Sequence, residues 1–259
     1  MCCSRHSPPY ARSNSLTSFA TRFHSSRIPR CSRLCSLSSP LGPLFISAVR
    51  NGVTREFEDA SDVWSRTLES REASRTRSQS GPSARKKPSQ LFLPSTTTIT
   101  HTSPTPAQLE SIASSPPNVP PPVLASYPPL AVFTNALLSA LNGLRLLAPA
   151  SLLHDLLNAL DGALARATTS LLSYMRASAD DRNNSTTTPS AEEKKREEDV
   201  VRAVGTVYVK VFIPFVRRAL VEGVYGIKVG DLQAKSEMIE DLRRAVEELQ
   251  GQLEENVDA

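Results

Sequence analysis

Two apolar-periodic segments separated by a single proline lie between residues 127 and 176, and they constrain the fold more than any other stretch. Apolar residues recur at steps of three and four in both segments, which places them on one face of a helix. These residues are Leu130, Phe133, Leu137, Leu141 and Leu144, then Leu153, Leu156, Leu157, Leu160, Leu164, Leu171 and Met175. Pro149 disfavours helical geometry at Ala148 and suits the first turn of the next helix. The stretch therefore predicts an αα-hairpin.

Another amphipathic helix is predicted upstream, over residues 43–71. Pro43 suits the start of a helix, and most charged residues lie off a single apolar stripe. The stripe consists of Leu44, Phe45, Ala48, Val49, Val53, Phe57, Ala60, Trp64 and Leu68. We expect Trp64, the one tryptophan of the sequence, to anchor a contact between helices. The alternative for this residue is stacking on a ligand.

A further helix is predicted after the hairpin. Ser190 and Glu193 have the spacing of a capping box, which marks the beginning of a helix. Apolar steps of three and four favour helix as far as Val224, although the β-branched residues of 207–213 would also suit a strand. We predict helix, with a kink or a break at Pro214.

Composition limits how much of the chain can form a core. The 259 residues include 20 Pro and only 5% aromatic residues. Segments with little apolar area cannot offset the entropy lost on ordering. We therefore predict an all-α fold, a helical hairpin or bundle of about four long helices with long disordered N-terminal and Pro-rich segments. The expected parts are a disordered basic Ser/Arg-rich tail (1–42), an amphipathic helix (43–71), a disordered Pro/Ser/Thr-rich linker (72–126), a helical domain (127–230) and a short coiled-coil-like C-terminal helix (231–259). Within the linker, one weak helical turn is expected near 107–113. The C-terminal helix is too short to be stable alone and needs a partner or a docking surface.

The N-terminal residues 1–40 are rich in Arg and Ser and contain no acidic residue. This composition resembles a mitochondrial transit peptide, although prolines interrupt any long amphipathic helix. A solvated basic tail is the alternative. The four cysteines, Cys2, Cys3, Cys31 and Cys35, lack the usual spacing of zinc ligands, so we predict free thiols and no metal site. No apolar run is long enough for a membrane span or a secretory signal, and none is predicted.

The motifs of common catalytic sites are absent from the sequence. There is no Gly-rich phosphate loop, no G-x-S-x-G and no H-E-x-x-H. His154 lies beside Asp155, but consecutive helical residues do not face each other, so we expect a histidine at the surface or the edge of the core. We predict no catalytic, cofactor-binding or metal-binding residues, no small-molecule substrate and no nucleic-acid binding. The chain is expected not to be an enzyme.

The hairpin sequence resembles a known family. Tyr127, Pro128 and Pro129 begin a YPPLA opening, Asn142 and Arg145 lie in a later N-G-L-R-L element, and Pro149 precedes a long Leu/Ala helix. This pattern is similar to the C-terminal region of the Dor1-like family, which is subunit 8 of the conserved oligomeric Golgi complex. Weaker likenesses cover residues 43–68 and the VYVKVFIPFVRRAL segment. Gly143 departs from the family, which usually has an acidic residue there.

The resemblance implies a truncated or divergent all-helical subunit of a Golgi vesicle tether. Such a subunit would support intra-Golgi retrograde transport and protein transport through helix–helix contacts with subunit 1 and the second-lobe subunits, as a peripheral protein on the cytosolic face of the Golgi membrane. The residues expected in the interaction or hairpin motif are Tyr127, Pro128, Pro129, Leu137, Asn142, Arg145 and Leu160. The alternative is a protein targeted to mitochondria by its Arg/Ser-rich N-terminus. In that alternative the chain could be an enzyme.

Overall fold

A computed structural model describes residues 38–70, 86–94, 104–146, 148–184, 190–228 and 239–258. These residues form helices and no strand, so the all-α prediction is confirmed, whereas the number of about four long helices is not. The chain divides into two units between residues 39 and 40, and the helices pack with one another within the second. The four cysteines and the proposed transit segment, up to residue 37, lie outside the described residues.

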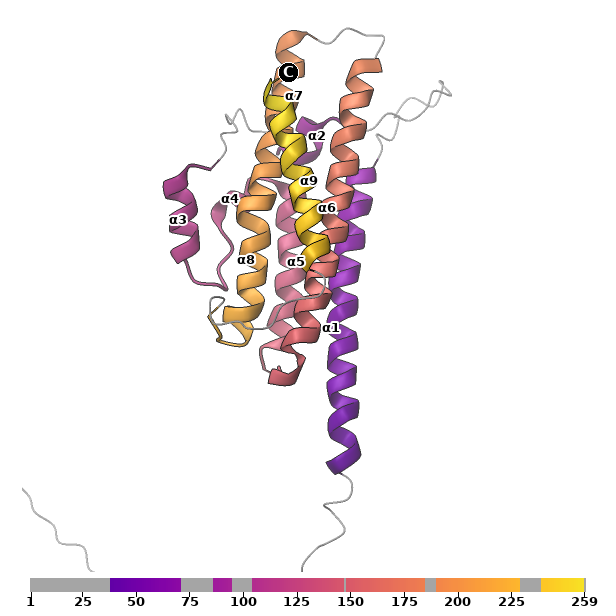
Figure 1. Ribbon diagram of the computed structural model, residues 1–259, viewed down its shortest axis with the longest axis vertical. Helices are drawn as coiled ribbons and strands as arrows, with labels where there is room; N and C mark the ends of the chain where they lie inside the picture. The colour runs from indigo at the N-terminus through magenta and orange to yellow at the C-terminus, as the bar shows by residue number, and fades with distance from the viewer. Residues whose placement is uncertain are drawn as a thin grey trace, which may run out of the picture. The chain divides into compact units, whose positions relative to one another are not determined.

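Five long helical segments form the bundle in the described part of the chain (Figure 1). They are α1 (Ser38–Glu69), α5 (Pro128–Leu144), α6 (Leu153–Asn184, after the 3₁₀ turn η1, Ala150–Leu152), α7 (Ala191–Val207, continued by η2, Tyr208–Phe212, α8, Ile213–Arg218, and η3, Ala219–Val224) and α9 (Ile239–Asp258). Three short helices precede α5: α2 (Pro88–Phe92), α3 (Pro106–Ser114) and α4 (Pro122–Ala125).

Helix α1 differs from its prediction in two ways. It begins at Ser38, so that Pro43 lies inside the helix. This position is tolerated because it is close to the helix start and only the hydrogen bond to the carbonyl four residues earlier is lost. The single expected stripe is also split. Val53, Phe57, Ala60, Trp64 and Leu68 are buried, whereas Leu44 and Phe45 are exposed.

A cluster of aromatic rings holds the long helices together. The ring of Trp64 stacks on Phe133 of α5 at 5.3 Å between centroids and on Tyr208 of η2 at 5.9 Å. The Trp64 indole also donates a hydrogen bond to the Ala167 carbonyl of α6, at 3.1 Å. Aromatic pairs at these separations add specific attraction to the area that they bury. The prediction that Trp64 anchors a contact between helices is therefore confirmed.

Helix α2 brings part of the predicted linker into the core. Leu91 and Phe92 are buried, and the Phe92 ring meets Tyr174 edge-on at 5.7 Å. The buried carboxylate of Glu197, on α7, accepts hydrogen bonds from the Ser89 amide at 2.8 Å and from the Ser89 hydroxyl at 2.5 Å. The backbone N–H groups in the first turn of a helix have no acceptor within the helix, and a carboxylate at this position accepts from one of them. The short helices α2 and α4 thus differ from the expected disordered linker, because a few apolar residues suffice to dock a short helix on a larger core, whereas α3 lies where a helical turn was expected.

The segment around Pro214 is helical throughout. Helix α7 widens into the π-helical turn η2 before Pro214, which then occupies the first turn of α8. A proline inside a helix disturbs the regular hydrogen bonding of the turn before it, and a wider π turn accommodates this disturbance. The helix therefore continues to Val224. Tyr208 in this turn is fully buried, and its hydroxyl lies 3.2 Å from that of Thr168 on α6. Burial raises the pKa of the Tyr208 phenol.

The C-terminal helix α9 docks on the bundle of its own chain. It packs against α6 and α7, with Leu242 and Leu249 buried. An exposed ion pair between Arg176 of α6 and Glu248 supplements this contact. The apolar seam of α9 therefore finds its docking surface within the same chain.

Candidate interaction surface

The described residues hold no group of three or more His, Cys, Asp or Glu side chains that could bind a metal ion. His154 is partly buried, and its Nε2 atom lies 3.4 Å from the side-chain amide of Asn158. Its neighbour Asp155 pairs instead with Arg50 of α1, at 3.2 Å. None of the helices described here has the length and apolar character needed to cross a membrane.

The predicted site residues at the start of α5 serve mainly to begin that helix. Tyr127 is the N-cap residue, and Pro128 and Pro129 occupy the first helical positions, where a missing N–H costs no hydrogen bond. The Tyr127 side chain is buried, which raises the pKa of its phenol. Pro129 is partly exposed and lines a surface groove.

The other predicted site residues separate into two pairs. Leu137 and Leu160 are fully buried in the core, so they are covered by this chain itself. Asn142 and Arg145 are exposed at the C-terminal end of α5. Of the residues expected in the interaction or hairpin motif, Leu137 and Leu160 thus belong to the core, and Asn142 and Arg145 to the surface.

A groove of about 400 Å³ runs between α1 and α5. Trp64 and Phe133 lie at its base, since both are buried, and Val63 and Val132 are 42% and 58% exposed along it. The wall formed by α5 carries small exposed residues at steps of three and four, Ala136, Ser139 and Gly143. Small side chains allow another helix to approach closely, because the distance between helix axes depends on the side chains at the contact. The groove has the shape and chemistry to receive a helix.

Sequence reasoning missed this groove because it followed the large apolar residues. A different signal was present: residues 128–144, which form α5, include no charged side chain. A helix on the surface of a bundle normally turns a charged face to water. An uncharged outer face on α5, flanked by Glu56 and Asp59 on α1, therefore marks a surface suited to contact.

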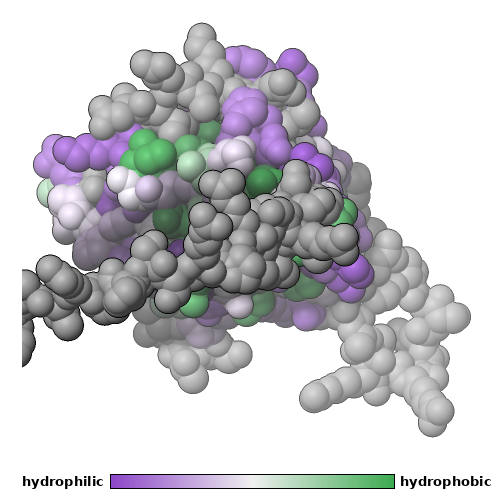
Figure 2. Space-filling model, turned by 90° about the horizontal axis from the view of Figure 1, so that it is seen from below, coloured by the Kyte–Doolittle hydropathy of each residue, from purple (hydrophilic) through white to green (hydrophobic). Residues whose placement is uncertain are grey.

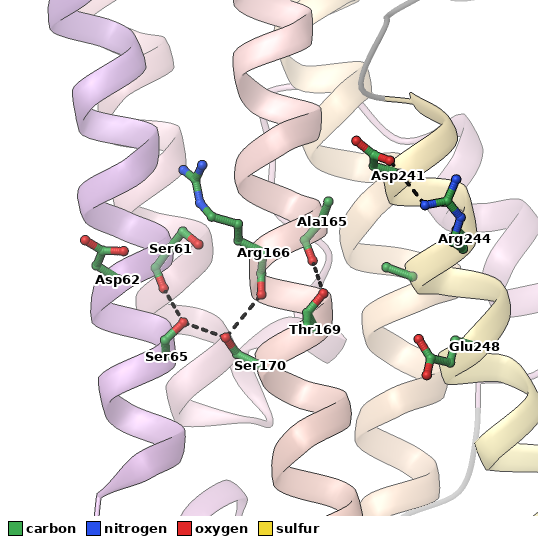
Figure 3. A pocket seen from close by; sticks show the side chains of 11 residues that line it. Ser61, Asp62, Ser65, Ala165, Arg166, Thr169, Ser170, Asp241, Arg244 and Glu248 are labelled. Atoms are coloured by element: carbon green, nitrogen blue, oxygen red, sulfur yellow. Dashed lines mark hydrogen bonds and ion pairs between the residues drawn. The ribbon is translucent and has the colours of Figure 1, made fainter.

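A second hollow, of about 520 Å³, lies between α1, α6 and α9 and is polar (Figure 3). The Ser65 and Ser170 hydroxyls lie 2.7 Å apart across it. Arg166 pairs with Glu58 at 3.7 Å, and Arg244 with Asp241 at 3.6 Å. These groups have partners within the chain, which makes the hollow a polar seam between helices.

One buried ion pair links α6 to α8. The Asp161 carboxylate is fully buried, and its Oδ1 atom lies 3.1 Å from the Nε atom of Arg217. A carboxylate in the interior is tolerated when a cation accompanies it. This pair explains an acidic residue on the otherwise apolar inner face of α6, and it assigns Asp161 to the packing of the bundle.

The surface is otherwise mixed in character. In the view from below, hydrophobic and hydrophilic side chains lie next to one another (Figure 2). The large exposed apolar residues of the described chain are Leu41, Leu44, Phe45, Val63, Val119, Val132 and Leu146. All but Val119 belong to α1, to α5 or to the turn that follows α5. Exposed apolar area is therefore concentrated on these two helices and on the turn after α5.

The fold and surface describe a helical bundle with a groove between α1 and α5. Comparison with known proteins gives a more particular likeness. A stretch of 58 residues is 48% identical to conserved oligomeric Golgi complex subunit 8 of Homo sapiens and 45% identical to that of Mus musculus. The stretch covers 22% of this chain and 10% and 9% of those relatives, so the chain spans about a tenth of their length. No family model matches the chain, and neither does any solved structure. The resemblance to subunit 8 expected from the sequence is confirmed over these 58 residues.

Proposed function

We propose that the chain is a non-catalytic subunit of the conserved oligomeric Golgi complex. In this proposal it supports vesicle tethering in intra-Golgi retrograde transport through helix–helix contacts with subunit 1 and the second-lobe subunits. The observation that carries the proposal is the 58-residue similarity to subunit 8. Its attachment to the cytosolic face of the Golgi membrane is peripheral in the same proposal.

The groove between α1 and α5 is the part of the surface that supports such contacts. An amphipathic helix laid in an apolar groove is a common mode of recognition, in which a few side chains anchor the helix. Val63 and Val132 provide exposed apolar area, and the small residues of α5 leave room for the side chains of a partner. We assign the groove as the site of subunit contact.

Co-purification tests the proposal. A tagged full-length chain expressed in cells should recover the other subunits of the complex, identified individually. Ala136→Arg places a long charged side chain in the groove and should lower that recovery by about tenfold or more, since interface centres tolerate unpaired charge poorly. Asn135→Arg is the matched control, because residue 135 is exposed on the same helix but does not line the groove.

Two results would contradict the proposal. One is that the full-length chain recovers none of the complex subunits. The other is a mitochondrial location that is lost when residues 1–42 are removed, which would favour the alternative of a mitochondrially targeted protein. If Ala136→Arg and Asn135→Arg recover the subunits equally, membership stands but the groove is not the contact.

A further inference from the structure

The N-terminal turns of α1 carry an exposed apolar stripe of their own. Leu41, Leu44 and Phe45 are 61%, 66% and 45% exposed, and Ala48 is exposed as well. Their spacing of three, four and seven residues places them on one face of the helix. Four neighbouring apolar residues that face water form an exposed hydrophobic patch, and such patches mark sites of interaction with a protein or a membrane.

This stripe is distinct from the face of α1 that packs in the bundle. At 100° per residue it lies roughly 150° around the helix from the buried face of Phe57, Ala60 and Trp64. On the bundle side of the same turns, Ile46 and Val49 pack against the core. In Figure 1 this end of α1 also extends beyond the neighbouring ends of α5 and α6. The stripe therefore cannot be buried by the helices that cover the rest of α1.

Charge is distributed unevenly along the sequence around this stripe. The first acidic residue of the chain is Glu56, and residues 1–55 contain eight arginines, which gives that part a charge of +8. The whole chain has a net charge of +4, so residues 56–259 carry 22 basic and 26 acidic residues, or −4. The exposed apolar stripe at residues 41–48 thus lies within the strongly basic part.

An apolar stripe combined with a high density of arginine suits an anionic lipid surface. The apolar side chains of an interfacial helix enter the boundary between headgroups and acyl chains, and basic residues are attracted to anionic headgroups. The binding strength of such a helix grows with the apolar area that it buries and with its electrostatic attraction to anionic lipids. A nucleic acid would use the arginines but would leave Leu41, Leu44 and Phe45 in water.

We propose that residues 41–48 of α1 insert into the surface of an anionic membrane, with the arginines of residues 1–55 strengthening the attachment. The inference deepens the proposed function and rests on it for the identity of the membrane. It gives the peripheral association a specific structural basis, the first turns of one helix.

Flotation of the purified full-length chain with lipid vesicles tests this inference. The chain should float with vesicles of phosphatidylcholine mixed with phosphatidylserine, and much less with phosphatidylcholine alone. Leu44→Ser combined with Phe45→Ser should lower the partition coefficient by about tenfold or more, because two large apolar side chains are lost from the lipid boundary. Val119→Ser combined with Leu146→Ser is the matched control, since these residues are also large, apolar and exposed but belong neither to the stripe nor to the groove, and it should leave the partition unchanged.

A second variant set separates charge from apolar insertion. Replacing Arg27, Arg30 and Arg33 by Gln should lower the partition by roughly fivefold per arginine at low salt, and less at high salt. Unchanged helical content by circular dichroism shows that each variant is folded. Flotation that is equal for the Leu44/Phe45 variant and the unaltered chain overturns the proposal.

The remaining outcomes are also distinguishable. If the arginine variant loses binding to vesicles and to single-stranded RNA alike while the Leu44/Phe45 variant loses neither, the basic part binds polyanions in general and the proposal is overturned. Failure to float while the complex subunits still co-purify removes the membrane inference alone. Flotation without co-purification keeps it and removes the proposed function.

Discussion

The two halves of α1 have the same kind of sequence but different surroundings. Phe57 and Trp64 in the C-terminal half are buried, and Trp64 packs against α5, α6 and η2, whereas Leu41, Leu44 and Phe45 in the first turns are exposed. Apolar periodicity therefore establishes that a helix has an apolar face and does not establish what covers it. Covered residues determine whether the chain folds, and uncovered ones determine what it can touch.

The largest expected effect comes from placing a charge in the covered region. Leu160→Asp should cost more than about 4 kcal/mol, because an unpartnered carboxylate would be buried, and this is a large part of the stability of a domain. Leu44→Asp places the same charge at an exposed position and should change the unfolding free energy by less than about 0.5 kcal/mol. Denaturant titration followed by circular dichroism measures both, and equal losses would contradict the distinction.

Replacing single side chains of α1 by alanine makes the same comparison within one helix. Trp64→Ala should destabilise the chain by about 3 to 5 kcal/mol, because it opens a cavity among stacked rings and removes the hydrogen bond to Ala167. Phe45→Ala should leave the unfolding free energy within about 0.5 kcal/mol of its original value. The same denaturant titration applies, and a loss for Phe45→Ala comparable to that for Trp64→Ala would show that a partner helix covers the N-terminal turns in the isolated chain.

A smaller effect is expected where α2 is held to α7. Glu197→Gln should cost about 1 to 3 kcal/mol, because the charged acceptor of the Ser89 amide and hydroxyl becomes neutral. Glu193→Gln removes only the exposed pair with Lys87 and should cost less than about 1 kcal/mol. Proteolysis between α1 and α5 should accelerate for Glu197→Gln and remain unchanged for Glu193→Gln. If it accelerates for neither variant, Glu197 does not hold α2 to α7.

The smallest expected effect is a decrease in the free energy of unfolding at alkaline pH. Burial raises the pKa of Tyr208, and it raises that of the half-exposed Tyr225 to about 12. The folded state therefore keeps protons that the unfolded state releases above its ordinary tyrosine pKa of about 10. This stabilisation is complete below that pH and is lost as the pH rises further. The denaturation midpoint should fall above about pH 10, with a shallower decline in Tyr208→Phe; an equal decline would exclude Tyr208 as a source.

Much of the fold could be predicted from the sequence because the long helices carry their own signal. Leu137 and Leu160 belong to two apolar faces with helical spacing, and helices α5 and α6 form where that spacing predicts them. Helix α2 could not be found in this way, because Pro88–Phe92 is too short for periodicity to show and lies in a Pro- and Ser-rich segment. Its position depends on Glu197, more than a hundred residues away.

The candidate surface was harder to predict than the fold. Leu137 and Leu160 were expected in an interaction or hairpin motif, and both are buried in the core of this chain. The α5 wall of the groove consists of residues with weak apolar character, such as Ala136 and Ser139, whose importance follows from the uncharged face that they share. Sequence spacing identifies faces, but the division between core and contact surface depends on tertiary packing.

The position of Trp64 has a consequence for observing this molecule. It is the only tryptophan of the chain, and it lies between the rings of Phe133 and Tyr208, with its indole N–H bonded to α6. Its fluorescence emission should therefore be that of an indole shielded from water and should move to longer wavelength when α1 separates from α5. The natural chain thus carries a built-in spectroscopic reporter at the junction of its helices, beside the groove that we assign to subunit contact.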